Sequence, residues 1–464
     1  MATPLHSRYL RLAFSPVKYS AGLMKIRQFV ARSVGGFIQA HRRRLANLSI
    51  ASTANGVVLF ASLVALAFNT RGLGASQFGV FTVIQGYVAL WAAICTLESW
   101  QAVCRLGTEE GADVRKICRR TLTLDVAAAV AGFALAASGI LLFGSAIGLS
   151  AEHKVLALIY ALTLLAGLAG TPKGYFRLID RFDVLAMNQV FNALLTVAAS
   201  LALWYLEADL PAYIYTFLAI GVVYRLQLVI QLLSKLKRTP PVSVAPVAQD
   251  LSFKRLAGMT FSISLLSAVI INRKNMALLT VSGIAGSAAA GIFAAAMKGA
   301  APLTKAADLT NQVIFSDVVR ALRAPVVNPG KVRRLRRLSF AMLALLMAAA
   351  GFGALLAKPL VEVLFDASFL GAAPVLAVLL FVEALHVAAL IFNPAFQARG
   401  ATHVLTSIYA MSVCVFVVLA VAAGSGLTPT LAALVLFGSM ALAYLAQSIL
   451  LLGPRGLLTR AIRP

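Results

Sequence analysis

Residues 428–452 read TPTLAALVLFGSMALAYLAQSILLL, a run of 25 residues without a charged side chain. A helix of about 20 residues crosses the hydrocarbon core of a bilayer, so this run is long enough to span a membrane. Its apolar residues do not alternate with polar ones, as they would in a strand of a membrane barrel. Because backbone polar groups in lipid must be satisfied within the segment, the run predicts a transmembrane helix.

The same pattern recurs along the whole chain. Of its 464 residues, 60% are hydrophobic and 12% are charged, and a water-soluble protein of this size cannot hide that much apolar surface. We therefore predict an all-α, polytopic membrane protein with about twelve transmembrane helices. The predicted spans are 48–69, 78–100, 122–144, 154–171, 184–206, 211–234, 256–280, 288–316, 338–357, 372–395, 402–424 and 428–452.

Basic residues gather in alternate segments between the predicted spans. If the N-terminus is cytoplasmic, the inside segments contain 33 of the 41 Lys and Arg residues, and the outside segments contain Arg71, Lys154 and Lys358. Cytoplasmic loops carry such an excess, so both termini are predicted to face the cytoplasm. The net charge of +25 belongs to these clusters rather than to one soluble face, which argues against nucleic-acid binding.

The first 47 residues contain no acidic side chain. Between Leu23 and Phe37, apolar residues recur at helical spacing with bases among them. This pattern is typical of a basic amphipathic helix on the cytoplasmic membrane surface, and a transit peptide has a similar composition.

A second break in composition lies near the middle of the chain. Residues 235–253 are polar and contain three prolines, which disfavour helix continuation. We predict a cytoplasmic linker here, between an N-lobe of six spans (48–234) and a C-lobe of six spans (254–452). The remaining residues, 453–464, form a cytoplasmic tail. Transporters are often built as two such repeats with the substrate between them.

Several short motifs occur in order along these spans. Arg71-Gly72-Leu73-Gly74 is followed by Phe78-Gly79-Val80-Phe81 in the first outside loop and the span after it. Four further stretches are Gln101–Arg105, Arg177–Asp183, Ala290–Ala294 and Asn393–Gly400. From about residue 48 onward, the chain thereby resembles the oligosaccharide flippases (O-antigen and polysaccharide translocases) of the multidrug/oligosaccharidyl-lipid/polysaccharide exporter superfamily. The first loop of that family carries R-x-L-G-x-x-x-F-G-x-F.

The resemblance implies a particular architecture and cargo. The family has twelve helices in two six-helix lobes around a central cavity, which opens alternately to either side. The implied cargo is a glycan linked to a lipid through a diphosphate. The resemblance does not identify the sugar.

Five basic residues interrupt the predicted spans: Arg225, Arg273, Lys274, Lys298 and Lys305. A charge in a span costs about 2.5–3.5 kcal/mol on insertion scales and usually faces a wet interior. The bases outnumber the acids in the spans, as a diphosphate cargo requires, so we predict that these five bind substrate. Arg225 can instead snorkel to the interface, and Lys305 can pair with Asp308.

Four titratable residues are candidates for proton or ion coupling: Glu383, His386, Asp308 and Glu98. Glu383 and His386 lie three residues apart on one helix face, where such a pair can relay a proton. The structural alternative is a histidine hydrogen-bonded to a carboxylate. Glu98 can instead meet Arg105.

The segment 172–183 alternates bases with acids. We predict a salt-bridged cytoplasmic loop that contains Arg177, Asp180, Arg181 and Asp183. The loop either fixes the adjoining helix ends or serves as a gate whose ion pairs break as the lobes move.

Together with the charges in the spans, the resemblance implies a transporter that flips a lipid-linked (polyprenyl diphosphate) oligosaccharide across the bacterial inner membrane by alternating access, for surface polysaccharide such as O-antigen. Membrane lipids and glycan-assembly enzymes are candidate partners. No catalytic residue, metal or cofactor is expected. Flipping requires no covalent chemistry, the sequence has no GxxxxGK[ST] motif for direct use of ATP, and its cysteines lack the spacing of metal ligands. The alternatives are a multidrug or metabolite antiporter of the same fold, which would favour acids in the spans, and a membrane glycan polymerase or ligase, which needs a sizeable outside loop.

Overall fold

The computed structural model describes the backbone of residues 16–95, 97–109, 111–238, 253–322 and 329–452. Within these ranges, the side chains of 16–48 and 304–322, and of some residues near 51, 238, 253–263 and 329–335, lie outside the description. Every extended regular element in the described residues is a helix, which confirms the all-α prediction.

The helices of the first half run up to Arg238. They are α1 (Pro16–Cys95), α2 (Ser99–Gly107), α3 (Val114–Phe143), α4 (Ala151–Ala161), the 3-10 helix η1 (Leu162–Leu164), α5 (Gly170–Leu178), α6 (Phe182–Tyr205) and α7 (Leu210–Arg238). The helices of the second half are α8 (Phe253–Leu322), α9 (Pro329–Leu355), α10 (Ala357–Leu364), η2 (Ala367–Phe369), α11 (Ala372–Leu390), α12 (Asn393–Ala398), α13 (Thr402–Ala423), η3 (Gly424–Gly426) and α14 (Pro429–Leu452).

Residues 1–53 form a unit of their own, and α1 begins within it at Pro16. The predicted amphipathic helix in 1–47 depends on side chains outside the description, so it stays a prediction. The second unit comprises residues 54–464.

Nine helical stretches among the described residues are long and apolar enough to cross a membrane. Two of them, Ser52–Gly107 and Ser264–Leu303, are long enough for two crossings, and each contains a glycine with non-helical backbone, Gly74 or Gly286. The fourth predicted span is divided among α4, η1 and α5 and is therefore not among the nine. When each of the two long stretches is counted as two crossings and the divided fourth span is added, the described residues agree with the prediction of about a dozen spans.

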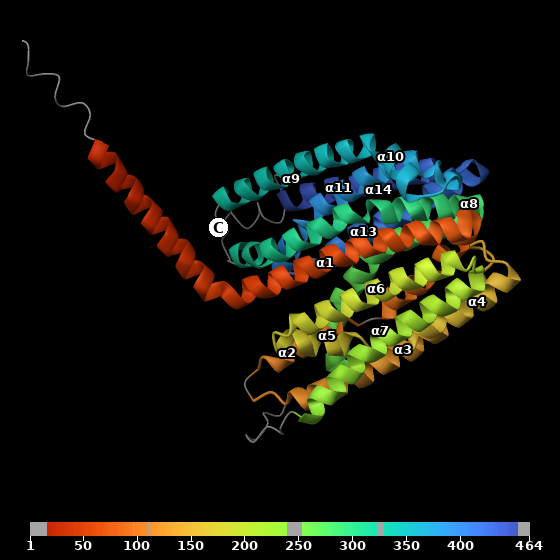
Figure 1. The fold of residues 1–464 in the computed structure, drawn as a ribbon, viewed down its shortest axis with the longest axis horizontal. Helices are drawn as coiled ribbons and strands as arrows, with labels where there is room; N and C mark the ends of the chain where they lie inside the picture. The colour runs from red at the N-terminus through yellow and green to blue at the C-terminus, as the bar shows by residue number, and fades with distance from the viewer. Residues whose placement is uncertain (1–15, 96, 110, 239–252, 323–328, 453–464) are drawn as a thin grey trace, which may run out of the picture. The chain divides into compact units, whose positions relative to one another are not determined.

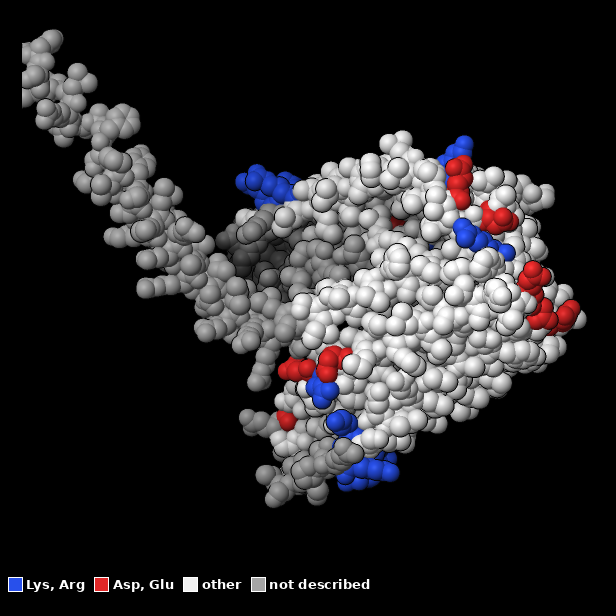
Figure 2. Space-filling model, in the orientation of Figure 1, with Lys and Arg blue, Asp and Glu red and all other residues white. Residues whose placement is uncertain are grey.

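The outward-facing side chains of this unit are those of a lipid-facing surface. Phe60, Leu142, Met187 and Leu345 are each at least 70% exposed. Figure 2 shows the charged side chains gathered toward the two ends of the face in view, with a broad uncharged band between them. A water-soluble protein rarely exposes so large an apolar area, whereas a membrane covers it.

Most helices pack against others of their own half. In the first half α2 packs on α3 and α5, and α7 packs on α5 and α6. In the second half α11 is central and contacts α8, α9 and α14 (Figure 1). From Val382 to Leu390 every residue of α11 is buried. The division into lobes at 48–234 and 254–452 remains a prediction.

Candidate functional site

Two helices that the sequence predicts as continuous are interrupted. In the second span α1 ends at Cys95, and α2 begins after Glu98, whose φ of 44° is left-handed. In the fourth span η1 ends at Leu164, and α5 begins only at Gly170. The predictions of continuous helices over 78–100 and 154–171, and of a loop over 172–183, are therefore wrong.

The cause of the second interruption is visible in the sequence. Gly167, Gly170, Pro172 and Gly174 follow one another closely, and glycine and proline both disfavour a helix interior. A new helix starts instead of a loop because its free N-terminal amides find a partner.

That partner is Asp125 of α3. Asp125 Oδ2 accepts a hydrogen bond from the Thr171 backbone N–H at 3.0 Å and another from Thr171 Oγ1 at 2.7 Å. Asp125 is 5% exposed and Thr171 is fully buried. Because the first amides of a helix are unpaired and carry partial positive charge, a buried carboxylate stabilises the start of α5.

The two short helices α2 and α5 lie side by side (Figure 1). A Cβ atom at Gly174 would lie 2.8 Å from Trp100 Cα and 2.9 Å from the Trp100 carbonyl oxygen, so only glycine fits here. Small residues allow this close approach of two helix backbones in a membrane. The two interruptions are thereby held together.

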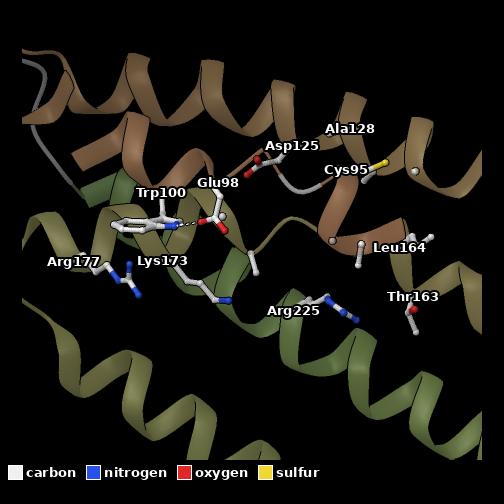
Figure 3. A pocket seen from close by; sticks show the side chains of 16 residues that line it. Cys95, Glu98, Trp100, Asp125, Ala128, Thr163, Leu164, Lys173, Arg177 and Arg225 are labelled. Atoms are coloured by element: carbon white, nitrogen blue, oxygen red, sulfur yellow. Dashed lines mark hydrogen bonds between the residues drawn. The ribbon is translucent and has the colours of Figure 1, made fainter. Parts of the chain in front are cut away.

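A cavity of about 360 Å³ opens where the interrupted helices meet. Its charged lining comprises three bases, Lys173, Arg177 and Arg225, and two acids, Glu98 and Asp125. In Figure 3 the three bases lie along one side of the cavity, below Glu98 and Asp125. Five α-helices, α1, α2, α3, α5 and α7, and the 3-10 helix η1 contribute to the described lining.

Both acids of the cavity already accept hydrogen bonds. Asp125 accepts from Thr171, and Glu98 accepts from Trp100 Nε1 (Figure 3). The Arg177 guanidinium lies over the Trp100 ring, 4.2 Å from its centroid, as a cation–π contact.

The bases of the cavity have weaker partners. Arg225 Nη1 donates to the Gly221 carbonyl oxygen of its own helix, at 3.4 Å. Within the part of the chain that the structure describes, no carboxylate lies within ion-pair distance of Lys173, Arg177 or Arg225. The cavity therefore has a surplus of positive charge and can bind an anion, with the two guanidinium groups suited to phosphate.

The four of the five predicted bases whose side chains are described do not lie together. Among these four, only Arg225 lines the cavity. Lys274 Nζ lies 2.7 Å from Glu383 Oε1, and Arg273, which is 2% exposed, donates from Nη1 to Met440 Sδ at 2.7 Å. Lys305 lies outside the described side chains.

Lys298 belongs to α8, and its side chain contacts the part of α1 that follows Gly74. Its Nζ is 3.4 Å from Gln85 Oε1 and 5.4 Å from the centroid of the Phe78 ring. Both partners belong to the first half of the chain, so Lys298 lies where helices of the two halves meet.

The three candidates for ion coupling whose side chains are described lie in two places. Glu383 forms the buried pair with Lys274, and His386 follows on the same helix with its ring 6.5 Å from that of Tyr409. His386 Nδ1 has no hydrogen-bond partner among the described residues. Glu98 meets Trp100 in the cavity, and Asp308 lies outside the described side chains.

The residues of the predicted gating loop divide between two places. Arg177 belongs to α5 and lines the cavity. Asp180, with φ of 55°, lies in the turn that follows α5. Arg181 Nε pairs with Asp183 Oδ1 at 2.9 Å on the surface. The choice between a fixed turn and a gate remains open.

Lys173 and Trp100 contribute to the cavity and were not predicted as site residues, nor was Asp125. The signal that points to them is the cluster of glycine and proline inside an apolar span. Such helix breakers in membrane segments occur where the backbone lines a cavity. The charged residues next to them are therefore candidates for site residues.

No family model matches the chain. A stretch of 176 residues, 36% of the chain, is 27% identical to the inner membrane protein YghQ of Escherichia coli strain K12. The match spans about half of that relative, 49% of its length.

Solved structures share the fold over nearly the whole chain. The lipid II flippase MurJ in an inward closed conformation aligns with a TM-score of 0.65 and 12% identity, over 87% of this chain and 86% of that one. A MOP-superfamily transporter from Pyrococcus furiosus aligns with 0.61 and 15%, over 86% and 93%. An inward-facing multidrug resistance MATE transporter aligns with 0.59 and 16%, over 84% and 95%.

These likenesses define the class of protein. The chain is a polytopic membrane protein with the fold of the MOP-superfamily transporters. At these identities the likeness is one of fold, and the cargo has to be argued from the cavity.

Proposed function

We propose that this protein flips an oligosaccharide linked to a polyprenyl diphosphate across the bacterial inner membrane by alternating access, for export of surface polysaccharide such as O-antigen. The observation that carries the proposal is the basic cavity at the two interrupted helices, inside a bundle whose outer face is apolar. Similarity to the fold of a lipid II flippase supports it.

The cavity supplies the groups that a diphosphate needs. Two guanidinium groups, from Arg177 and Arg225, can each bind phosphate oxygens in bidentate fashion, and Lys173 adds a third positive charge. Trp100 and Glu98, beside them, offer an apolar ring and a hydrogen-bond acceptor to a sugar. The polyprenyl tail stays in lipid, against the apolar outer surface.

The remaining predicted bases take different parts in this proposal. Lys298, at the contact of the two halves, meets the headgroup once the halves separate. Arg273 and Lys274 chiefly hold the second-half helices together, because Lys274 is already paired with Glu383. The helices α2 and α5 adjoin the basic segments that are predicted to be cytoplasmic. Cargo therefore enters the cavity from the inner leaflet.

The test is made in the native bacterium. Deletion of the gene should cause lipid-linked oligosaccharide to accumulate in the inner leaflet, as measured by its inaccessibility to a glycosidase or lectin added from outside. Arg225→Gln should reproduce this accumulation and slow transport about tenfold or more, because a hydrogen bond to a charged group contributes about 1.5–3 kcal/mol.

Arg119→Gln is the matched control, because Arg119 is exposed on α3 and lines no part of the cavity. It should transport normally at an equal amount of protein in the membrane. Accumulation of unpolymerised units on the outer face would favour the polymerase instead. Normal transport by a correctly inserted Arg225→Gln protein would exclude the cavity as the cargo site.

A further inference from the structure

The two halves of the chain share a short repeated segment at their kinks. Gly74-Ala75-Ser76-Gln77-Phe78-Gly79-Val80-Phe81 in the first half corresponds to Gly286-Ser287-Ala288-Ala289-Ala290-Gly291-Ile292-Phe293 in the second. Each segment has glycine at its first and sixth positions and phenylalanine at its eighth. The first glycine has nearly the same backbone conformation in both, with φ/ψ of 64°/173° and 85°/176°.

The repeated segments cross each other reciprocally. A Cβ atom at Gly79 would overlap the Ser287 carbonyl oxygen, and a Cβ atom at Gly291 would overlap the Ala75 carbonyl oxygen. In each case the sixth residue of one segment contacts the second residue of the other. The Ser76 and Ser287 hydroxyl oxygens, 3.0 Å apart, add a hydrogen bond across the same contact.

At the two glycines this contact is made by backbone atoms. Glycine lets two membrane helices approach until their main chains touch, and a single methyl group would force them apart. Any substitution at Gly79 or Gly291 must therefore separate the two helices or displace them along each other.

Other contacts between the two halves lie at the same end of the molecule, which we call the kink end and define by Gly74 and Gly286. Arg71 Nη2 donates to the Val363 carbonyl oxygen at 2.9 Å. A Cβ atom at Gly283 would overlap the Ala146 carbonyl oxygen. The Phe78 and Phe369 rings meet edge to face with centroids 5.7 Å apart.

We propose that the reciprocal glycine crossing is the outer gate of the transporter: it closes the kink end toward the outside, and it must come apart for cargo to leave. The inference rests on the proposed transport. Arg71, Lys154 and Lys358 belong to the segments that the charge distribution places outside, so the kink end is the outer end. The glycine crossing itself contains no ion pair and no bulky side chain, so its two backbones can separate at little cost.

The first test measures water access below the crossing. Thr82 is 2% exposed and lies one helical turn from Gly79, on the same face of the helix. Thr82→Cys is the reporter, labelled by a membrane-impermeant maleimide added outside right-side-out vesicles and mapped by peptide mass spectrometry. The native cysteines Cys95, Cys104, Cys118 and Cys414 serve as internal references.

Gly79→Ala and Gly291→Ala should each raise the labelling rate of this reporter from outside by about tenfold, because overpacking destabilises the closed state. Gly351→Ala in α9 is the matched control, since nothing lies within 4 Å of an added Cβ atom there. Equal labelling in all three variants would overturn the gate, and so would increased labelling only from the inside.

The second test holds even if the alanine variants are not inserted. Ser76→Cys with Ser287→Cys should form a disulfide under mild oxidation, stop transport and release it on reduction. Absence of the disulfide, or transport that continues with it, would overturn the proposal. If the parent protein moves no lipid-linked oligosaccharide, the proposed function fails, while the labelling and cross-linking results still decide the gate.

Discussion

At the scale of single residues, Asp125 connects the wall of the cavity to the start of α5. It is one of few acids in the membrane-spanning part, and its oxygen binds two donors of Thr171. A lone acid in an apolar span was visible in the sequence, but its role was not, because its partner lies 46 residues further along the chain.

Asp125→Asn should destabilise the protein by about 1–3 kcal/mol, because a buried helix start loses its charged acceptor. It should also reduce transport, since α5 positions Lys173 and Arg177. Thermal unfolding in detergent and transport of lipid-linked oligosaccharide are the two measurements.

Asp113→Asn is the matched control. Asp113 also caps a helix, accepting from the Lys116 backbone N–H at 2.9 Å, but it lies in the connection before α3 and lines no part of the cavity. This variant should lose a little stability and no transport. Equal transport by both variants would mean that the cap has no part in shaping the site.

In the second half of the chain, the burial of charged residues was predictable from the sequence but their pairing was not. Arg273, Lys274 and Glu383 were visible as charges inside spans, and the expectation that such groups avoid lipid holds for all three: Arg273 and Glu383 are buried, and Lys274 is largely so. Their pairing could not be foreseen, because Lys274 and Glu383 are more than a hundred residues apart. Removing one partner of a buried pair leaves an uncompensated charge, which is costly in the interior of the protein.

At the scale of helices, long uninterrupted runs were predictable and interrupted ones were not. The run 428–452 contains no charge and nearly coincides with α14. The run 154–171 looked equally apolar, yet its helix stops at Leu164 and restarts at Gly170. Hydropathy records the apolar character of a segment, whereas the interruption depends on Asp125 and on the close packing of α2 with α5.

Gly174→Ala should therefore disrupt the cavity although it changes no charge. The added methyl group would lie 2.8 Å from Trp100 Cα, so α5 must move away from α2. We expect a loss of transport larger than that of any single neutral substitution outside the cavity. Quenching of Trp100 fluorescence by a soluble quencher, measured in a variant with Trp100 as its single tryptophan, should increase at the same time.

Gly438→Ala in α14 makes the same chemical change where nothing lies within 4 Å of the new atom. Alanine is favoured over glycine in a helix by about 1 kcal/mol, so this control should be unchanged or slightly more stable. Matching behaviour of the two variants would show that the contact between α2 and α5 does not shape the cavity.

At the scale of the whole molecule, the chain was expected to surround one basic hollow. The class of fold is confirmed, but the described bases divide among the cavity, the pair with Glu383 and the contact at Lys298. Sequence spacing places charges along each helix, and only the packing of helices decides which charges meet.

The predicted orientation is testable on its own. Lys154→Cys and Lys358→Cys should react with an impermeant thiol reagent added from outside, and Arg119→Cys should react only after the membrane is opened. Lys358 is the exposed partner of Glu362, so labelling there reports topology and not local unfolding. The reverse pattern would place the basic segments outside and contradict the charge rule.

The capped start of α5 also has a consequence for biogenesis. A short, glycine-rich segment with unpaired amides inserts poorly into lipid by itself. When the ribosome reaches Gly170, however, Asp125 has already been synthesised, so the fourth segment can leave the translocon directly onto its finished neighbours. Nascent chains that carry Asp125→Asn should therefore stall at this stage, with the fourth segment still cross-linkable to the translocon.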